Sequence, residues 1–277
     1  TGSVTNSSGT FTNSGTTGDW TNDGTVDNSG TMGNGTNSGT FTNSGTVGDT
    51  TNSGTFTNNS GATVASLTNT GTVTNDGTIT GNTTNSGTLT NNGTGGDITN
   101  TGTVTNSGTF GIVTNTSGTF TNSGTTGDWT NGGTMDNSGT MGNGTNSGTY
   151  TMTAGNVGTV NNSGTFNFIT GTVGDITNSG TLDLTNTTTP SSIGGYTQTA
   201  SGTTTIDANS TYTVSGPAVL DGHIIINNAP TAFGRYTYLT ADSISGTFAD
   251  FTATPSGNSY LKYGPTTVKL YVTPDNV

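Results

Sequence analysis

The chain offers few side chains for acid–base or nucleophilic chemistry. It has a single histidine, His223, whose nearest carboxylate in the sequence is Asp221, beside a run of apolar, β-forming residues. A histidine in that setting is expected to face or cap a strand rather than to act as a general base. Serine is abundant, but no Gly-Asp-Ser-Gly motif is present, so no Ser/His/Asp triad is indicated. We therefore expect no enzyme, no catalytic residue and no cofactor.

A file of aspartates raises the question of metal binding. Asp19, Asp49, Asp97, Asp128 and Asp175 each follow a glycine at equivalent places in a repeat, and regularly spaced carboxylates can bind calcium. Calcium-binding solenoids place Gly-Gly-x-Gly-x-Asp in tandem, whereas these aspartates recur only every two or three repeats. The chain has no cysteine, which excludes disulfides and thiolate metal sites. We expect solvated corner carboxylates and no bound metal.

The composition is polar and acidic. Of 277 residues, 25% are apolar, 6% are charged and 47 are glycine, values that ordinarily indicate disorder. All 15 acidic residues are Asp, and the net charge of -12 disfavours nucleic acid or an anionic membrane as a partner. No segment approaches the roughly 20 apolar residues of a membrane helix, and no leader pattern is present. Any signal peptide or membrane anchor is expected outside this sequence.

A regular repeat explains how such a chain can fold. Gly-Thr pairs recur from Gly9 to Gly54 with steps that alternate between six and nine residues, so that two steps make a unit of fifteen. The phase continues to Gly180 with steps of fifteen to seventeen residues, which gives about twelve units. Repeating units can stack short strands and bury one narrow apolar column instead of a broad core.

Each unit carries three positions that hold apolar or small residues. Thr, Asn, Ser and Gly are poor helix formers, and Thr-Phe-Thr and Thr-Val-Thr alternate with the period of a strand. Gly and Asn between them tolerate the positive φ of tight corners. The sequence therefore predicts an all-β fold: a single-stranded, three-sided β-solenoid (β-helix) with coils of about 15–16 residues and a C-terminal β cap. In the first three coils the inward positions are Phe11, Thr17 and Trp20, then Val26, Met32 and Gly35, then Phe41, Val47 and Thr50.

Residue size is exchanged between neighbouring coils. The large Trp20 shares its coil with the small Thr17 and lies one coil from Gly35. A close-packed interior requires such compensation, because total core volume is conserved. We expect Trp20 to fill the space beside Gly35, and Phe41 and Phe56 to share the same surroundings.

Equivalent asparagines recur at one corner of every coil, outside the predicted core. Stacked Asn amides can hydrogen-bond to their copies above and below, since such amides seek partners. We expect a structural ladder rather than a binding site. Its members are Asn13, Asn28, Asn43, Asn58, Asn75, Asn91, Asn106, Asn122 and Asn137.

Outward threonines of the same strands form a Thr-x-Thr file, which we call the threonine face and take as the candidate adhesive face. Threonine is also a common exposed strand residue, so the file can be purely structural. Contact with a protein or glycan is a second interpretation. Ice binding is a third, opposed by Asp27 and Asp136, which interrupt the file. The threonine face consists of Thr10, Thr12, Thr40, Thr42, Thr55, Thr57, Thr72, Thr74, Thr88, Thr90, Thr103, Thr105, Thr119 and Thr121.

The repeat dissolves after Gly180. Residues 187–195 are polar and include Pro190, and longer apolar strands follow. We place a domain boundary near residue 190, between a repetitive β-solenoid (1–189) and a C-terminal β-helix cap (190–277) that would close the stack. Strands are expected at 195–199, 203–207, 211–214, 223–226, 236–240, 247–251, 260–263 and 267–272.

Four segments of this cap resemble elements of autotransporter passengers. Gly195–Ile206 is similar to the family's Y-x-Q element, Ala218–Ile226 to its A-x-L-x-G strand, Tyr236–Phe248 to its G-x-F element, and Tyr260–Val272 to its closing strand pair. The resemblance covers about 80 residues and is to pertactin-like and AIDA-type adhesins of type V secretion. It implies that this region caps the β-helix and nucleates folding outside the cell. It also implies an outer-membrane barrel in cis, outside this sequence.

These observations lead to a hypothesis of a bacterial cell-surface adhesin, exported through the outer membrane. Its partners would be other copies of itself, or a host surface protein or glycan, and not nucleic acid. Weak contacts repeated along the coils would add to strong attachment. The alternatives are a structural stalk that presents another domain and, less favoured, an ice-binding solenoid.

Overall fold

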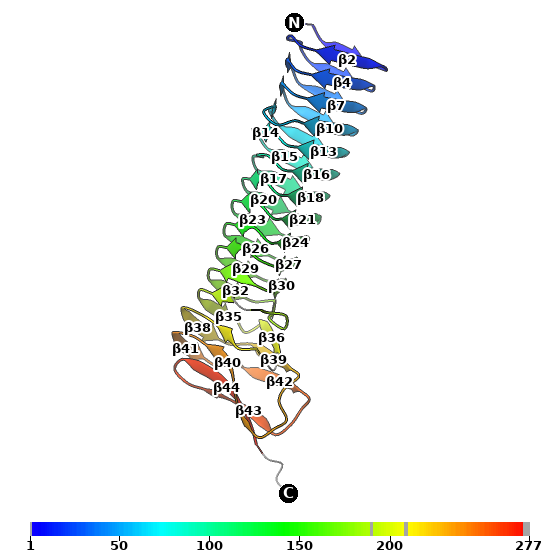
Figure 1. The fold of residues 1–277 in the computed structure, drawn as a ribbon. Helices are drawn as coiled ribbons and strands as arrows, with labels where there is room; N and C mark the ends of the chain where they lie inside the picture. Colours follow the sequence, from blue (N-terminus) through cyan, green and yellow to red (C-terminus); the bar gives the residue numbers. More distant parts are fainter. Residues whose placement is uncertain (1, 189–190, 208–209, 274–277) are drawn as a thin grey trace. The chain divides into compact units, whose positions relative to one another are not determined.

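The computed structural model describes residues 2–188, 191–207 and 210–273. Within these ranges it contains strands and no helix, and the chain divides into two compact units, Thr1–Met135 (unit 1) and Asp136–Val277 (unit 2). Both units are parallel β-solenoids, as the repeat predicts, and together they contain about 14 turns (Figure 1). The domain boundary predicted near residue 190 falls on Thr189 and Pro190, which lie outside the described residues, and it stays a prediction.

Each turn of unit 1 has three sides. The first and the second side are each one parallel sheet built from successive turns, and the third side consists of two shorter parallel sheets. The strands of the first side are β1 (Val4–Asn6), β3 (Trp20–Asn22), β6 (Gly35–Asn37), β9 (Thr50–Asn52), β12 (Leu67–Asn69), β15 (Thr83–Asn85), β17 (Ile98–Asn100), β20 (Val113–Asn115) and β23 (Trp129–Asn131). Those of the second side, which Figure 1 shows as one column, are β2 (Thr10–Asn13), β4 (Thr25–Asn28), β7 (Thr40–Asn43), β10 (Thr55–Asn58), β13 (Thr72–Asn75), β16 (Thr88–Asn91), β18 (Thr103–Asn106) and β21 (Thr119–Asn122). Those of the third side are β5 (Thr31–Met32), β8 (Thr46–Val47), β11 (Thr63–Val64), β14 (Thr78–Ile79), β19 (Thr109–Phe110) and β22 (Thr125–Thr126).

The parallel register places equivalent residues of successive turns on top of one another. Phe11 pairs with Val26, Val26 with Phe41, and Phe41 with Phe56. Phe41 and Phe56 are completely buried, and their rings stack with centroids 5.1 Å apart. Phe11 belongs to the first turn and is half-buried. The predicted vertical stacking of the fifteen-residue units is therefore confirmed.

Exchange of side-chain volume between turns is visible at Trp20. Trp20 lies opposite Gly35 in the first-side register, and a Cβ atom on Gly35 would stand 2.3 Å from the indole ring. The indole Nε1–H donates a hydrogen bond to the carbonyl of Gly33 at 2.9 Å, and the ring centroid lies 4.4 Å from that of Phe41. The absence of a side chain at Gly35 therefore leaves the space that the Trp20 ring fills, as predicted.

Most corner glycines of unit 1 are required by the close approach of successive turns rather than by positive φ. A Cβ atom on Gly30 would stand 2.0 Å from the carbonyl oxygen of Gly15, and one on Gly45 would stand 2.0 Å from that of Gly30. Gly30 and Gly45 do not use the positive φ that glycine tolerates; they are needed because the preceding turn occupies the space of a side chain. Within the described residues, positive φ occurs at Gly9, Gly61, Gly155, Gly171, Gly222, Gly246 and Asn228.

Unit 2 has the same three sides, and β24 (Thr134–Asn137) contains the point of division between the units. The strands of its first side are β26 (Gly144–Asn146), β29 (Val160–Asn162), β32 (Ile176–Asn178), β35 (Tyr196–Gln198), β38 (Pro217–Leu220) and β41 (Ser243–Gly246). Those of the second side are β27 (Thr149–Met152), β30 (Thr165–Phe168), β33 (Thr181–Asp183), β36 (Thr203–Asp207), β39 (His223–Asn227) and β42 (Asp250–Thr254). Those of the third side are β25 (Thr140–Met141), β28 (Asn156–Val157), β31 (Gly171–Val173) and β34 (Ser191–Ile193).

A fourth sheet in unit 2 departs from the parallel pattern. Its order is β37 (Tyr212–Thr213), β40 (Gly234–Thr240), β44 (Thr267–Val272) and β43 (Ser259–Tyr263), and β44 runs antiparallel to both of its neighbours. Its inner face carries the buried Val268, Leu270 and Val272. The expected strand at 247–251 is displaced to β42, and the other expected strands each overlap an observed one.

Candidate functional site

The threonine face lies on the second side of unit 1. The register superposes its members, since Thr40 pairs with Thr55 and Thr42 with Thr57, and it continues in the same way through the later turns. The first threonine of each strand is exposed, and the second is exposed or half-buried. The structure thus brings all fourteen predicted threonines into two adjacent columns.

One carboxylate interrupts the second of these columns. Asp27 is exposed and stands in register between Thr12 and Thr42. The first column continues past this point through Thr25, which pairs with both Thr10 and Thr40. The two columns are therefore uniform only in the second-side strands after β4, from β7 to β21.

Threonine also lines the other two sides of unit 1, a feature that was not predicted from the sequence. On the third side Thr31 pairs with Thr46, and both are exposed. The pattern x-Thr-Asn of each first-side strand indicates this arrangement, because the middle residue of an inward–outward–inward triplet faces out. The first-side column consists of Thr5, Thr21, Thr36, Thr51, Thr68, Thr84, Thr99, Thr114 and Thr130. The second side is distinguished by having two columns rather than one.

The predicted asparagine ladder is inside the solenoid, not outside its core. Asn13, Asn28, Asn43, Asn58, Asn75, Asn91, Asn106, Asn122 and Asn137 are all buried. In unit 1, the Nδ2 of each one donates to the Oδ1 of the next at 2.7–2.8 Å, from Asn13 through Asn122. The expectation of an outer position is wrong because Asn13 follows Phe11 by two residues, and strand alternation places both on the inward face.

A second buried ladder runs along the first side and was not predicted. In Asn37, Nδ2 donates to Asn52 Oδ1 at 2.7 Å, to the Gly39 carbonyl at 3.1 Å and to the Thr55 carbonyl at 3.0 Å. Each amide thus binds the next turn and also holds the corner of its own turn, which makes the ladder structural. Its members in unit 1 are Asn6, Asn22, Asn37, Asn52, Asn69, Asn85, Asn100, Asn115 and Asn131, and Asn146, Asn162 and Asn178 form the equivalent ladder of unit 2.

The corner aspartates act as braces between turns. Asp19 Oδ1 accepts the backbone N–H of Asn34 at 3.0 Å, and Asn34 Oδ1 accepts that of Asp49 at 2.8 Å. Asp97 does the same for Ile112 at 2.8 Å. Within the described residues no group of three or more His, Cys, Asp or Glu side chains is placed to hold a metal ion.

His223 has an acidic neighbour that the sequence did not reveal. Asp250 lies opposite it in the β39–β42 register, with Oδ2 3.5 Å from Nδ1, and Thr252 Oγ1 lies 3.1 Å from Nε2. The carboxylate that pairs with the imidazole is therefore not Asp221, the nearest one in the sequence. The order hydroxyl, imidazole, carboxylate is that of an activated nucleophile, but the Asp250 side chain is 78% exposed and Thr252 is exposed too. Water screens such a pair, which leaves the imidazole little driving force to activate the hydroxyl.

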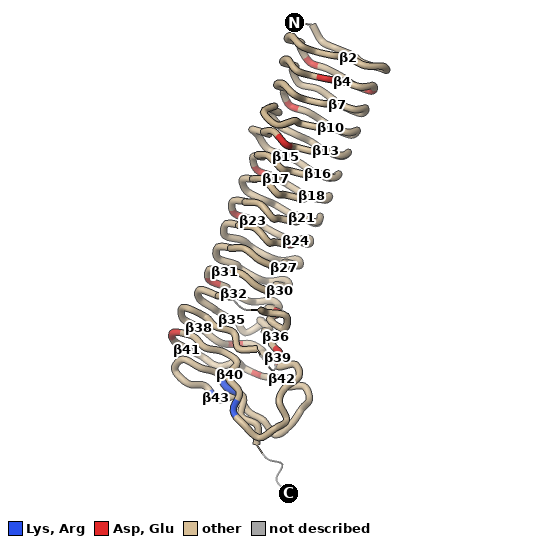
Figure 2. Tube along the Cα trace, viewed as in Figure 1, with Lys and Arg blue, Asp and Glu red and all other residues tan. Residues whose placement is uncertain are grey.

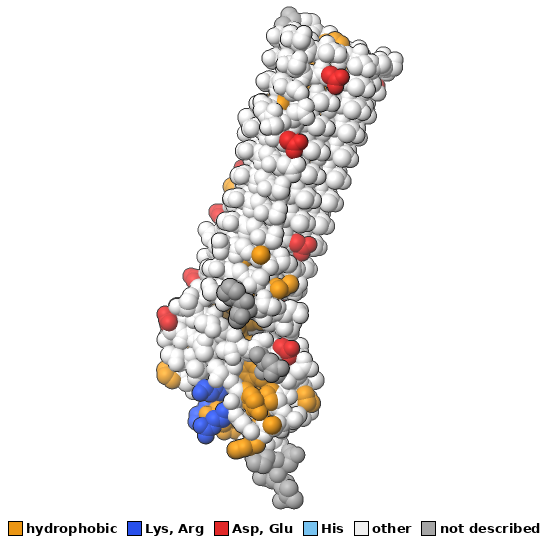
Figure 3. Space-filling model, in the orientation of Figure 1, with side chains coloured by type: hydrophobic (Ala, Val, Ile, Leu, Met, Phe, Trp, Pro, Cys, Tyr) orange, Lys and Arg blue, Asp and Glu red, His pale blue; other side chains and the backbone are white. Residues whose placement is uncertain are grey.

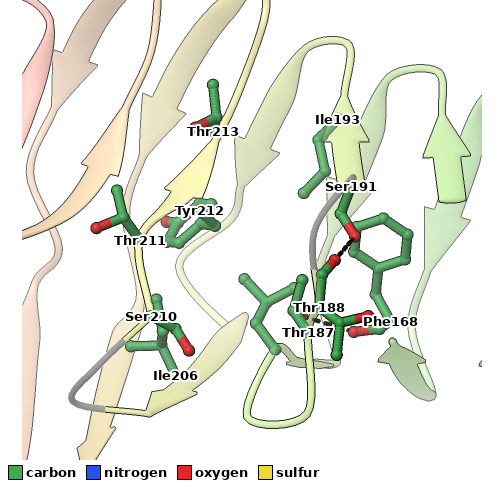
Figure 4. A pocket seen from close by; sticks show the side chains of 11 residues that line it. Phe168, Thr187, Thr188, Ser191, Ile193, Ile206, Ser210, Thr211, Tyr212 and Thr213 are labelled. Carbon is green, nitrogen blue, oxygen red and sulfur yellow. Dashed lines mark hydrogen bonds between the residues drawn. The ribbon is translucent and has the colours of Figure 1, made fainter. Parts of the chain in front are cut away.

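Unit 2 also contains a pocket of about 420 Å³ (Figure 4). Its apolar lining includes Phe168, Ile193 and Ile206, and its polar lining is mostly hydroxyl groups such as those of Thr187 and Ser191. Among the described lining residues there is no charged side chain. The pocket is suited to a neutral molecule and offers no acid–base chemistry.

Comparison with protein-family models, with curated proteins and with solved structures finds no match. In the part of the chain that the structure describes, no helix is long and apolar enough to cross a membrane. Function must therefore be argued from the surfaces of the two units themselves.

Proposed function

We propose that this chain belongs to a bacterial surface adhesin of the autotransporter type, in which the threonine face of unit 1 makes the attachment. The partner would be another cell, a matrix component or a second copy of the chain. Export through the outer membrane, with a barrel encoded in cis, is part of the same proposal and follows from the resemblance of the C-terminal segments to passenger elements.

The supporting observation is the in-register double column of threonines on the second side. Parallel strands repeat about every 4.8 Å, so each hydroxyl and methyl group recurs at that spacing along successive turns. A surface with that repeat meets a partner through many equivalent contacts, each of them weak. Two copies of the face have the same repeat and can therefore match each other.

A structural stalk is the second candidate, and one observation favours it. Exposed threonines line all three sides of unit 1, as Thr36 on the first side and Thr46 on the third side show. Exposed threonine on every side is expected when threonine serves only as a favourable exposed strand residue. The two proposed functions differ in one respect: an adhesin attaches through the second side in particular, whereas a stalk uses all three sides equally.

The test compares two sides of the same turns. The double variant Thr55→Lys/Thr72→Lys places cations on the threonine face, and the control Thr51→Lys/Thr68→Lys places them on the first side. All four positions are exposed strand residues. Aggregation of beads coated with each full chain, and sedimentation of the chain across concentrations, measure self-attachment.

We expect the second-side variant to lose bead aggregation while the first-side control retains it, because like charges facing each other oppose the contact. Equal behaviour of both variants, or no aggregation and no cell binding by the unmodified chain, would remove the adhesive role. Replacement of the repeats by an unrelated rod with full retention of adhesion would establish the stalk instead.

A further inference from the structure

The three basic residues of this acidic chain are gathered on one sheet of unit 2. Arg235 lies on β40, Lys262 on β43 and Lys269 on β44, and Figure 2 shows the blue segments confined to this region. No acidic residue occurs in these three strands. The chain has 15 aspartates and three basic residues, so a sheet that carries all three basic residues and no aspartate is locally positive in an acidic protein.

The register places these cations on the same face as two tyrosines. Arg235 is opposite Tyr271, which is opposite Tyr260, and Lys262 is opposite Lys269. Alternate residues of a strand share a face, so all five project from the side of the sheet opposite the buried Leu270. We call these five residues the basic face.

Two of the three cations lie over an aromatic ring. Arg235 Cζ lies 5.2 Å and Lys262 Nζ 5.4 Å from the centroid of the Tyr271 ring, which is within cation–π range. Among the described residues, no carboxylate forms an ion pair with Arg235, Lys262 or Lys269. Lys262 and Lys269 stand directly opposite each other, which destabilises an antiparallel pair. The basic face thus carries positive charge that the described part of the protein does not neutralise.

Flat apolar surface lies next to this charge. The rings of Tyr260 and Tyr271 stack with centroids 5.3 Å apart and planes 21° from parallel. Tyr260 is 48% exposed, and Phe233 beside it is 76% exposed. Figure 3 shows basic side chains next to hydrophobic ones in this part of the surface. They border a hollow of about 430 Å³, within the range of about 300–1,000 Å³ that is typical of ligand pockets.

We infer that the basic face binds an acidic polysaccharide, with the carboxylates of uronic acid units on Arg235 and the lysines and a sugar ring stacked on Tyr260 and Tyr271. Arg pairs with carboxylates through two parallel hydrogen bonds, and the C–H face of a pyranose ring packs on a flat aromatic surface. The basic face and the threonine face consist of different residues, so either proposal can be disproved while the other holds.

The charge density of the face selects among anionic partners. Binding to anionic membranes ordinarily uses clusters of about 4–8 basic residues, and this face has three. Duplex DNA carries one charge per about 1.7 Å, and a chain of net charge -12 repels so dense a polyanion. A polysaccharide with one carboxylate per sugar ring matches three spaced cations beside an aromatic platform.

The test measures binding of the full chain to polygalacturonate, with uncharged dextran as the reference polymer. Arg235→Gln, Lys262→Gln and Tyr260→Ala each remove one part of the face at an exposed position. Thr177→Asp changes the net charge by the same unit as Arg235→Gln, at an exposed first-side position of unit 2. Circular dichroism and the melting temperature of each variant establish that it is folded.

We expect the unmodified chain to bind polygalacturonate and not dextran, with affinity falling as salt is raised. Each of the three face variants should raise Kd by about tenfold or more, while Thr177→Asp should leave it unchanged. Equal binding by all variants, no binding at low salt, or tighter binding to single-stranded DNA or to vesicles containing phosphatidylglycerol would overturn the inference. Loss of self-association in the face variants with polygalacturonate binding intact would assign the face to a second copy of the chain.

Discussion

At the scale of single residues, the interior of unit 1 is unusual because the side-chain amides of asparagine fill part of it. Every turn buries two asparagines, and each is bonded to a copy in the next turn and to backbone carbonyls at its own corner. Buried polar groups cost little when all their hydrogen-bonding capacity is used, and much when it is not. A chain with only 25% apolar residues can therefore have a well-packed interior, because part of that interior is a hydrogen-bonded amide column.

Replacement of one ladder asparagine by aspartate tests this account. Asn52 Nδ2 donates to Asn69 Oδ1 at 2.9 Å, to Gly54 O at 3.0 Å and to Thr72 O at 3.2 Å. In Asn52→Asp an ionised carboxylate faces these three oxygens with nothing to donate. We expect the free energy of unfolding to fall by about 3 kcal/mol or more, measured by urea unfolding with tryptophan fluorescence.

The control for Asn52→Asp is Asn82→Asp, at an exposed corner position of the same unit, which should change stability by less than about 0.5 kcal/mol. Burial raises the pKa of a new carboxyl group. The Asn52→Asp defect should therefore shrink as the pH falls and the carboxyl regains a proton to donate. Equal stability of the two variants at neutral pH would show that the ladder contributes nothing.

How far the sequence predicts these features depends on the residue type. The in-register stacking of Phe41 on Phe56 follows from the repeat length alone, and the exchange of volume between Trp20 and Gly35 follows from close packing. The burial of Asn13 is predictable as well, because strand alternation places it on the inward face with Phe11, although asparagine is a residue type common at corners. The approach of Asp250 to His223 could not be predicted, because the 27-residue separation lies outside the repeat and its register depends on loops.

At the scale of elements, successive turns are joined by parallel strand pairing along their sides and approach each other closely at their corners. Successive corner glycines of unit 1 stack so closely that the carbonyl of one occupies the position where the next would carry a side chain. Positive φ is the commoner reason for glycine in a turn, but Gly30 and Gly45 do not have it. A corner glycine in the sequence is compatible with either reason, positive φ or close approach of another turn. Only the positions of the stacked turns in the structure show which reason applies.

Glycine-to-alanine variants at one corner file test the close approach. In Gly30→Ala the new methyl group would stand 2.0 Å from the Gly15 carbonyl oxygen, whereas in Gly15→Ala it would meet nothing within 4 Å. We expect Gly30→Ala to lower the free energy of unfolding by about 1–3 kcal/mol, as overpacking does, and Gly15→Ala to be neutral or slightly stabilising. Chemical denaturation of both variants checks this, and equal midpoints would contradict a packing role for the corner file.

At the scale of the whole molecule, the two units differ in the chemistry that they bury. All eight tyrosines belong to unit 2, and both tryptophans belong to unit 1. Burial raises the pKa of Tyr150, Tyr196 and Tyr212 far above the ordinary phenol value and raises that of Tyr238 to about 12. The hydroxyl groups of Tyr212 and Tyr238 have no hydrogen-bond partner among the described residues.

These buried phenols predict that alkali unfolds unit 2 before unit 1. A group whose pKa is higher in the folded state favours folding while it is protonated, so its contribution is complete below the unfolded pKa of about 10 and is lost as the pH rises through the folded value. Unit 2 should therefore lose stability from about pH 10 upwards, and tyrosinate absorbance should develop together with loss of its β signal. Tryptophan fluorescence, which reports on unit 1, should stay native through the same range. Tyr238→Phe removes one buried phenol without removing its ring, so it should move the alkaline midpoint upward, and a tryptophan change that precedes tyrosine ionisation would refute the assignment.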